Sequence, residues 1–193
     1  SVYGENKKVP FETTHNVDHP ISLYAATKKS NELMAHTYGH LYGFKTTGLR
    51  FFTVYGPWGR PDMAYYLFAE AISNDKPIKV FNNGEMERDF TYIDDIVQGV
   101  VSTLLKESKN SNLYKLYNIG NGKPVQLINF IESLEKVLDI TATKKMLPMQ
   151  DGDVYQTFAS TSKLEHDFAY KPKTRVDDGI YEFVKWYKNF YSI

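Results

Sequence analysis

Tyr24 and Lys28 stand four positions apart in the stretch Ser22-Leu23-Tyr24-Ala25-Ala26-Thr27-Lys28. On a helix this spacing places the two side chains one turn apart on the same face. A tyrosine with an ordinary pKa near ~10 is a poor base at neutral pH, but a neighbouring ammonium group stabilises its phenolate form. The pair could therefore take a proton from a hydroxyl group of a bound molecule. Because two-residue motifs arise often by chance in a chain with 15 tyrosines, the flanking sequence has to decide.

The flanking sequence predicts the helix that this pair requires. Ser22 is a favourable residue for the start of a helix, and Gly43 is favourable at its end, which predicts a helix over residues 23–42. Its apolar residues recur at helical spacing and form one stripe: Met34, Tyr38, Leu41 and Tyr42. Residues 46–52 are β-branched and aromatic, which predicts a buried strand. Ser1 to Tyr3 resemble the end of another strand, so the helix fits the crossover of a parallel sheet.

Helices and strands continue to alternate in the rest of the chain. Periodicity and turn residues predict further helices over 63–74, 94–106, 124–138, 162–168 and 176–191. They predict further extended segments over 78–81, 90–93, 114–119 and 141–147. Asp94 is expected to cap the helix that it opens. The alternation indicates an α/β protein.

Composition excludes several classes of function. The 193 residues are 42% hydrophobic and 24% charged, which is ordinary for a globular protein. The 23 basic and 23 acidic residues balance, so no broad field favours nucleic acid or an anionic membrane. There is no cysteine and no apolar run near the ~20 residues that span a bilayer, so we expect a cytoplasmic protein. His36 and His40 have helical spacing, but no third ligand accompanies them and no metal is expected.

Three motifs in order carry a resemblance to a known family. They are Ser1-Val2-Tyr3-Gly4, then Pro20 followed by Tyr24 and Lys28, then Leu49-Arg50-Phe51-Phe52-Thr53-Val54-Tyr55-Gly56-Pro57. From residue 1 to at least Asp153 the chain resembles the second half of an extended short-chain dehydrogenase/reductase, and is most similar to the UDP-glucuronate 4-epimerases. This implies the C-terminal part of a Rossmann-like doubly wound parallel sheet plus a smaller α/β substrate-binding domain. Residues 1–56 would finish the NAD-binding domain and 57–193 would mainly bind a UDP-sugar, with strand 114–119 a candidate to return to the Rossmann sheet.

The glycine-rich phosphate loop of such enzymes is absent from this sequence. In a dinucleotide-binding fold that loop follows the first strand. Gly120-Asn121-Gly122 lacks the third glycine and comes late in the chain. We therefore expect the NAD-binding half to precede residue 1, and the 193 residues alone to be inactive. The residue that chooses between NAD and NADP would also lie in that half.

The resemblance assigns roles to individual residues. Tyr24 would be the catalytic base, and Lys28 would support it and bind the nicotinamide ribose. Phe51 and Phe52 would line the nicotinamide, and Thr53 would touch the sugar. Ser1 would face the sugar as well. It stands where related dehydratases and decarboxylases have a catalytic glutamate, so this chain has no general acid or base at that position for the additional step of those enzymes.

Three further residues would hold the charged parts of the substrate. Arg60, within Gly56-Pro57-Trp58-Gly59-Arg60-Pro61-Asp62-Met63, would bind a sugar carboxylate. Arg88 would bind the UDP diphosphate and Asp153 the ribose. Asp151 stands where the glucuronate group tends to have proline, a departure that concerns loop stiffness.

The sequence thus predicts a 4-epimerase that interconverts UDP-glucuronate and UDP-galacturonate through a 4-keto sugar with bound NAD. By analogy, the helix over 23–42 would pack against its copy in a homodimer. One alternative is a 4-epimerase of a neutral UDP-hexose or UDP-N-acetylhexosamine. Another is a non-catalytic protein that binds NAD or a nucleotide sugar, which would be expected to lack Tyr24 or Lys28.

Overall fold

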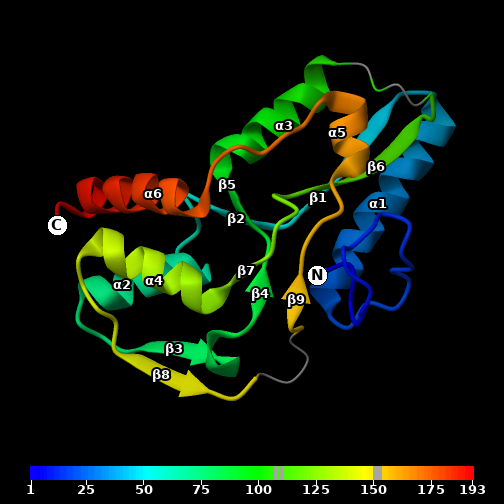
Figure 1. Cartoon of the computed structure of the whole chain (residues 1–193). Helices are drawn as coiled ribbons and strands as arrows, with labels where there is room; N and C mark the ends of the chain where they lie inside the picture. Colours follow the sequence, from blue (N-terminus) through cyan, green and yellow to red (C-terminus); the bar gives the residue numbers. More distant parts are fainter. Residues whose placement is uncertain (107, 109–110, 150–153) are drawn as a thin grey trace.

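A computed structural model of the chain describes residues 1–106, 108, 111–149 and 154–193. The helices are α1 (Leu23–Tyr42), α2 (Ala64–Ser73), α3 (Ile93–Leu105), α4 (Leu127–Leu138), α5 (Ser162–Phe168) and α6 (Val176–Tyr191), with a 3-10 turn at Asn82–Gly84. The strands are β1 (Thr46–Phe51), β2 (Thr53–Tyr55), β3 (Ile78–Phe81), β4 (Glu87–Arg88), β5 (Phe90–Tyr92), β6 (Tyr114–Ile119), β7 (Val125–Gln126), β8 (Lys144–Leu147) and β9 (Gln156–Thr157). Figure 1 shows how these elements gather around two regions of sheet.

The first region is built on the parallel pair of β1 and β6, in which Thr46 lies opposite Tyr114 and Phe51 opposite Ile119. Helix α1 contacts both strands, and α3 and α5 lie beside them (Figure 1). The apolar residues buried between β6 and these last two helices are Ile96, Tyr117, Ile119, Leu164, Phe168 and Tyr170. Strand 114–119 therefore belongs to the same sheet as residues 46–51, although more than 60 residues separate them in the sequence.

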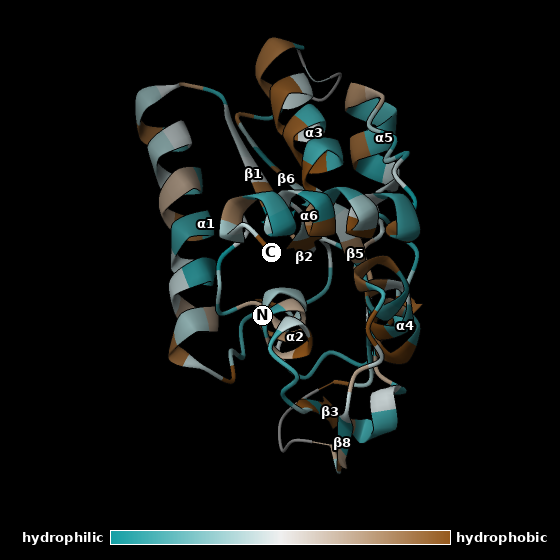
Figure 2. Ribbon diagram, turned by 90° about the vertical axis from the view of Figure 1, so that its left-hand side faces the viewer, coloured by the Kyte–Doolittle hydropathy of each residue, from teal (hydrophilic) through white to brown (hydrophobic). Residues whose placement is uncertain are grey.

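The second region contains the larger core. Strands β3 and β8 pair in parallel at one side, and helix α2 contacts β3. Helix α4 packs against α2 and also against α6. Three buried aromatic rings contact one another at its centre, those of Tyr55, Phe90 and Phe130. Phe183 of α6 joins this group through the ring of Tyr65. Figure 2 shows hydrophobic residues concentrated in α3 and α4, with a more mixed surface on α1. Strands β2 and β5 pair in parallel between the two regions, so this strand pair connects them.

The α/β architecture with parallel strand pairs predicted from the sequence is confirmed. Helix α1 begins and ends as predicted, because the Ser22 hydroxyl accepts the Ala25 N–H and Gly43 adopts a left-handed φ of 72°. The predicted helix over 124–138 is wrong at its start, since residues 125–126 first form β7. Residues 2–5 form a turn rather than the end of a strand. The predicted cap at Asp94 is also wrong, because Tyr92 holds the cap position and no side chain caps the helix there.

The predicted apolar stripe of α1 does not face the sheet. Met34, Tyr38, Leu41 and Tyr42 are all exposed, whereas the helix buries the small residues Ala25 and Gly39. Small residues allow the helix to approach β1 and β6 closely, which leaves the larger side chains on the outer side. Within the described residues, no helix is both long enough and apolar enough to cross a bilayer.

Candidate active site

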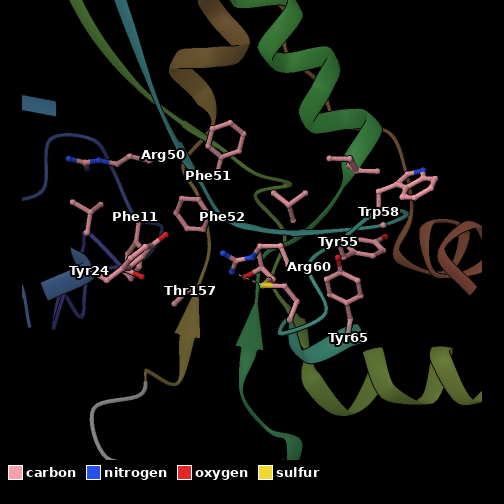
Figure 3. Close-up of a pocket in the computed structure, with 18 of the residues that line it drawn as sticks. Phe11, Tyr24, Arg50, Phe51, Phe52, Tyr55, Trp58, Arg60, Tyr65 and Thr157 are labelled. Atoms are coloured by element: carbon pink, nitrogen blue, oxygen red, sulfur yellow. Dashed lines mark hydrogen bonds between the residues drawn. The ribbon is translucent and has the colours of Figure 1, made fainter. Parts of the chain in front are cut away.

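A cavity of about 850 Å³ opens where β1 and β2 meet the start of α1 and the loop that follows β2. Six residues singled out from the sequence line it: Ser1, Tyr24, Phe51, Phe52, Thr53 and Arg60. Figure 3 shows Tyr24 and Phe11 on the same side of the cavity and Arg60 near its centre, directed toward the side where Phe52 and Thr157 lie. The strand ends therefore gather residues from three separate parts of the sequence around one space.

Tyr24 and Lys28 lie on the first turns of α1, as their spacing predicted. The Lys28 ammonium nitrogen is 5.2 Å from the centre of the Tyr24 ring, a distance typical of a cation–π contact. The Tyr24 side chain is more than half exposed, so its hydroxyl is accessible to a molecule in the cavity. The arrangement joins an accessible phenol to a positive charge, which is the chemistry required of a general base.

A buried ion pair fixes α1 on the sheet. The Arg50 guanidinium on β1 donates to both carboxylate oxygens of Glu32 on α1, with Nε–Oε1 at 2.7 Å and Nη2–Oε2 at 2.9 Å. The same guanidinium lies 4.7 Å from the centre of the Tyr3 ring, and the Tyr3 hydroxyl donates to Asn118 on β6. A two-bond contact of this kind fixes orientation as well as distance. It therefore sets where the N-terminal turns of α1, and with them Tyr24, stand relative to β1.

Arg60 comes from the loop of residues 56–63 between β2 and α2. Its Nε lies 3.4 Å from an oxygen of Asp62, and its Nη2 lies 3.5 Å from the sulfur of Met63. Both charged side chains of this ion pair are about 70% exposed, with values of 72% and 69%, so the pair contributes little to stability. The guanidinium is therefore available to bind an anionic group in the cavity.

Arg88 lines a second cavity of about 640 Å³ that has apolar walls from α2 and β3. Thr53 lines both cavities, so they adjoin each other at β2. The Arg88 Nη1 donates to the carbonyl oxygens of Val154 and Tyr155, at 2.8 and 3.3 Å. Arg88 therefore also holds the segment that follows residues 150–153. Asp153, predicted to bind a ribose, lies outside the described residues.

Asp89, next to Arg88, is completely buried and joins three segments. Its Oδ1 accepts the N–H of Asn121, and its Oδ2 accepts the N–H groups of Gly122 and Ala159, at distances of 2.7 to 3.0 Å. Burial raises the pKa of Asp89 above its ordinary value, while the three N–H donors act in the opposite direction. Asp95 does similar work at α3, where it accepts the N–H groups of Lys173 and Thr174.

Sequence reasoning missed the roles of Arg50, Asp89 and Asp95. Each is a charged residue inside or beside a run of strand or helix residues that is otherwise apolar. Such a position is a usable signal, because a buried charge requires a partner. The sequence does not say which partner, since Asp89 pairs with residues more than 30 positions away. In the described part of the chain, no group of three or more His, Cys, Asp or Glu side chains is placed to hold a metal ion.

Comparison with known proteins identifies the family. The profile of the NAD dependent epimerase/dehydratase family matches residues 1–120. The chain belongs to this family. Two curated relatives are similar over the whole chain: "Protein CapI" of Staphylococcus aureus is 52% identical, and the "Probable UDP-glucuronate 4-epimerase" of Rhizobium meliloti is 47% identical. These alignments cover 100% and 99% of this chain but only 62% and 60% of the two relatives.

Solved structures of nucleotide-sugar epimerases share the fold. The UDP-glucuronic acid 4-epimerase of Bacillus cereus, in complex with UDP-glucuronic acid and NAD, superposes with a TM-score of 0.88 at 36% identity, over 99% of this chain and 60% of that one. The UDP-glucose 4-epimerase of Thermotoga maritima superposes with a TM-score of 0.87 at 27% identity, over 98% and 60%. The Rossmann-like α/β fold class is thereby confirmed, and the fold is shared by enzymes of acidic and neutral sugars.

Proposed function

We propose that the full-length protein is a nucleotide-sugar 4-epimerase that interconverts UDP-glucuronate and UDP-galacturonate with bound NAD. The observation that carries this proposal is the cavity that brings Tyr24, Thr53 and Arg60 together, with Lys28 beside Tyr24. Similarity to relatives and structures named UDP-glucuronate 4-epimerase supports the same assignment. The chain spans about three fifths of those proteins, so the proposal concerns the whole protein.

The residues present fit a nicotinamide cofactor. The Phe51 side chain is about half exposed, with a value of 52%, and it lines the cavity together with Phe52 and Tyr24. A flat aromatic wall beside an accessible phenol suits a planar ring at the carboxyl end of a parallel strand. When bound, NAD would supply the acceptor and later the donor of a hydride at C4 of the sugar.

The residues of this chain would manage the proton and hold the substrate. Tyr24 takes the proton of the sugar 4-hydroxyl and returns it after the 4-keto sugar has turned over in the cavity. Lys28 keeps a positive charge beside the phenolate and binds the nicotinamide ribose. Ser1, which lines the same cavity, faces the sugar. Arg88 and Asp153 hold the UDP, whose base fits the apolar second cavity.

Arg60 and Thr53 would hold the sugar carboxylate. Oxidation at C4 of glucuronate makes a β-keto acid, which loses CO₂ readily when the C–CO₂ bond stands perpendicular to the carbonyl plane. A guanidinium and a hydroxyl that bind the carboxylate keep that bond away from this geometry. A neutral UDP-hexose is the second candidate substrate, and the similarity to a UDP-glucose 4-epimerase is the observation that favours it.

The remaining proposals concern assembly and location. The exposed apolar stripe of α1 supports a homodimer in which this helix packs against its copy. The two-domain division, with residues 1–56 in the NAD-binding domain and 57–193 mainly in the UDP-sugar domain, is also proposed, and the β1–β6 pairing supports the return of 114–119 to the first sheet. An NAD-dependent activity supports a cytoplasmic location.

The test is Tyr24→Phe in the full-length protein. We expect turnover of UDP-glucuronate to fall by about 10² to 10⁴, the usual contribution of a positioned base, while substrate affinity stays nearly unchanged. Tyr38→Phe is the matched control, because Tyr38 lies on the same helix with a similar exposed fraction, 55% against 58% for Tyr24. Product formation is measured by chromatography of UDP-galacturonate. A Tyr24→Phe protein that keeps most of its rate would contradict the proposal.

A further inference from the structure

Trp58 lies two residues before Arg60 and has an unusual backbone conformation. Its φ is 60°, in the left-handed region that bulky residues rarely adopt. Its side chain is 75% exposed, so burial of the ring in a core does not account for the conformation. A residue keeps such a conformation only where its surroundings hold it there. The backbone conformation of Trp58 must therefore be held by contacts with other residues.

Two aromatic rings of α6 contact the Trp58 ring. The centre of the Trp58 ring is 5.3 Å from that of Trp186 and 5.5 Å from that of Phe190. Trp186 and Phe190 stack on each other at 5.3 Å. Figure 3 shows Trp58 at the side of the cavity that borders α6, away from Arg60 at the centre. Ring pairs at these distances stabilise the loop conformation that forms them.

The next residues of the loop are held from a second side. Gly59 lies directly over the hydroxyl of Tyr65, so close that a Cβ at Gly59 would clash with that oxygen. The loop is thus fixed at Trp58 by α6 and at Gly59 by Tyr65, immediately before Arg60.

Arg60 has no comparable support of its own within the described chain. Its ion pair with Asp62 is exposed, and its other contact is the sulfur of Met63 at 3.5 Å. A long side chain with such weak restraint points in a defined direction only if its backbone is fixed. Trp58 and Gly59 are the residues that fix it.

We propose that Trp58 is a positioning residue for Arg60. By packing on Trp186 and Phe190, Trp58 orients the Arg60 guanidinium toward the sugar carboxylate. Helix α6 thus sets the preference for an acidic sugar without touching the substrate. This inference rests on the proposed function. It adds that residues 186 and 190, outside the lining of the main cavity, contribute to substrate selection.

The test compares Trp58→Ala with Trp58→Phe in the full-length protein. Trp58→Ala should raise the KM for UDP-glucuronate about 3- to 10-fold, the range expected for one lost aromatic contact, and leave kcat within about 2-fold. Trp58→Phe keeps a ring for Trp186 and should restore most of the affinity. The inhibition constant of the neutral competitor UDP-glucose should not change in either variant, because it has no carboxylate. A general loss of structure would weaken both ligands.

Phe190→Ala tests the same contact from the α6 side and should raise the same KM. Its matched control is Tyr181→Ala, because Tyr181 lies on the same helix with a similar exposed fraction, 55% against 52%, and has no ring contact among the described residues. Wild-type KM for UDP-glucuronate in Trp58→Ala, or equal losses for both ligands, would overturn the inference. If the wild type epimerises UDP-glucuronate, only the inference is then wrong. A wild-type protein that does not epimerise UDP-glucuronate would instead refute the proposed function, and the inference with it.

Discussion

Replacing Asp89 with alanine would leave three N–H groups without an acceptor, one of them buried and two partly buried. Asn121, Gly122 and Ala159 donate to this carboxylate, and the Thr91 hydroxyl donates to it as well. Each buried donor left unpaired costs about 1–3 kcal/mol, so the sum could reach about 9 kcal/mol. Asn121 and Gly122 lie in a loop that can shift to admit water, which lowers the sum. We therefore expect Asp89→Ala to lower the free energy of unfolding by about 4 kcal/mol, a large part of a typical total of about 5–15 kcal/mol.

Asp89→Asn separates the two halves of this network. Its amide oxygen can still accept from Gly122 and Ala159, but its NH₂ group then faces the N–H of Asn121, where Asp89 has an oxygen. We expect Asp89→Asn to lower the free energy of unfolding by about 2 kcal/mol, half of the decrease expected for Asp89→Ala. Because the network adjoins Arg88, both variants should also weaken the binding of UDP.

Urea denaturation of the full-length protein, followed by circular dichroism, measures these differences. Asp94→Ala is the control: Asp94 is an exposed carboxylate in the first turn of α3, and its loss should cost at most about 1 kcal/mol. If Asp89→Ala cost no more than this control, the carboxylate would not hold the three segments, and the cost of unpaired donors assumed here would be wrong.

Two further predictions concern charge. Arg60→Ala should raise the KM for UDP-glucuronate about 10- to 100-fold, as expected for a lost charge-assisted contact, and should increase CO₂ release. The inhibition constant of UDP-glucose should stay the same. Equal losses for both sugars in steady-state kinetics would favour the neutral substrate. Burial disfavours the ionised form of Asp167, but hydrogen bonds from Tyr117, His166 and Ser108 outweigh it and hold the pKa of this carboxyl below its ordinary value. Ionised Asp167 therefore stabilises the fold at pH values above the ordinary carboxyl pKa. The difference in the free energy of unfolding between wild type and Asp167→Asn should be largest above about pH 5 and shrink as the pH falls through the lowered pKa. A difference that does not change with pH in urea titrations would contradict this.

The parts of the fold that local sequence determines were predictable. The capping residues and spacing of Ser22, Tyr24 and Lys28 depend only on neighbours along one helix, and the structure agrees with them. Strands β4, β7 and β9 were not predicted, because each has two residues and exists only through pairing with distant parts of the chain. The outward direction of the α1 stripe was missed for a related reason. Periodicity shows that a helix has an apolar face, but not which side the sheet occupies.

The candidate site likewise combines features set by local sequence with features set by contacts between distant parts of the chain. Residues of one motif, such as Phe51, Phe52 and Thr53, line one cavity as predicted, because they are consecutive in the sequence where β1 passes into β2. The hydrogen bonds of Arg88 to Val154 and Tyr155 could not be foreseen, because they join segments 66 and 67 positions apart. The contact of Trp58 with α6 joins residues that are still more distant in the sequence.

The pairing of β2 with β5 fixes the distance between the two cavities. Thr53, which borders both cavities, lies opposite Phe90, and Arg88 stands two positions before Phe90 along the same chain segment. The distance between the cavity lined by Arg60 and the cavity lined by Arg88 is thus set by the backbone hydrogen bonds of this strand pair, which do not depend on the identity of the side chains. Under the proposed function, substitutions in the loop of residues 56–63 alter which sugar is accepted while this spacing stays constant. An insertion between residues 88 and 90 would instead change how long a ligand the protein can hold, whatever sugar it carries.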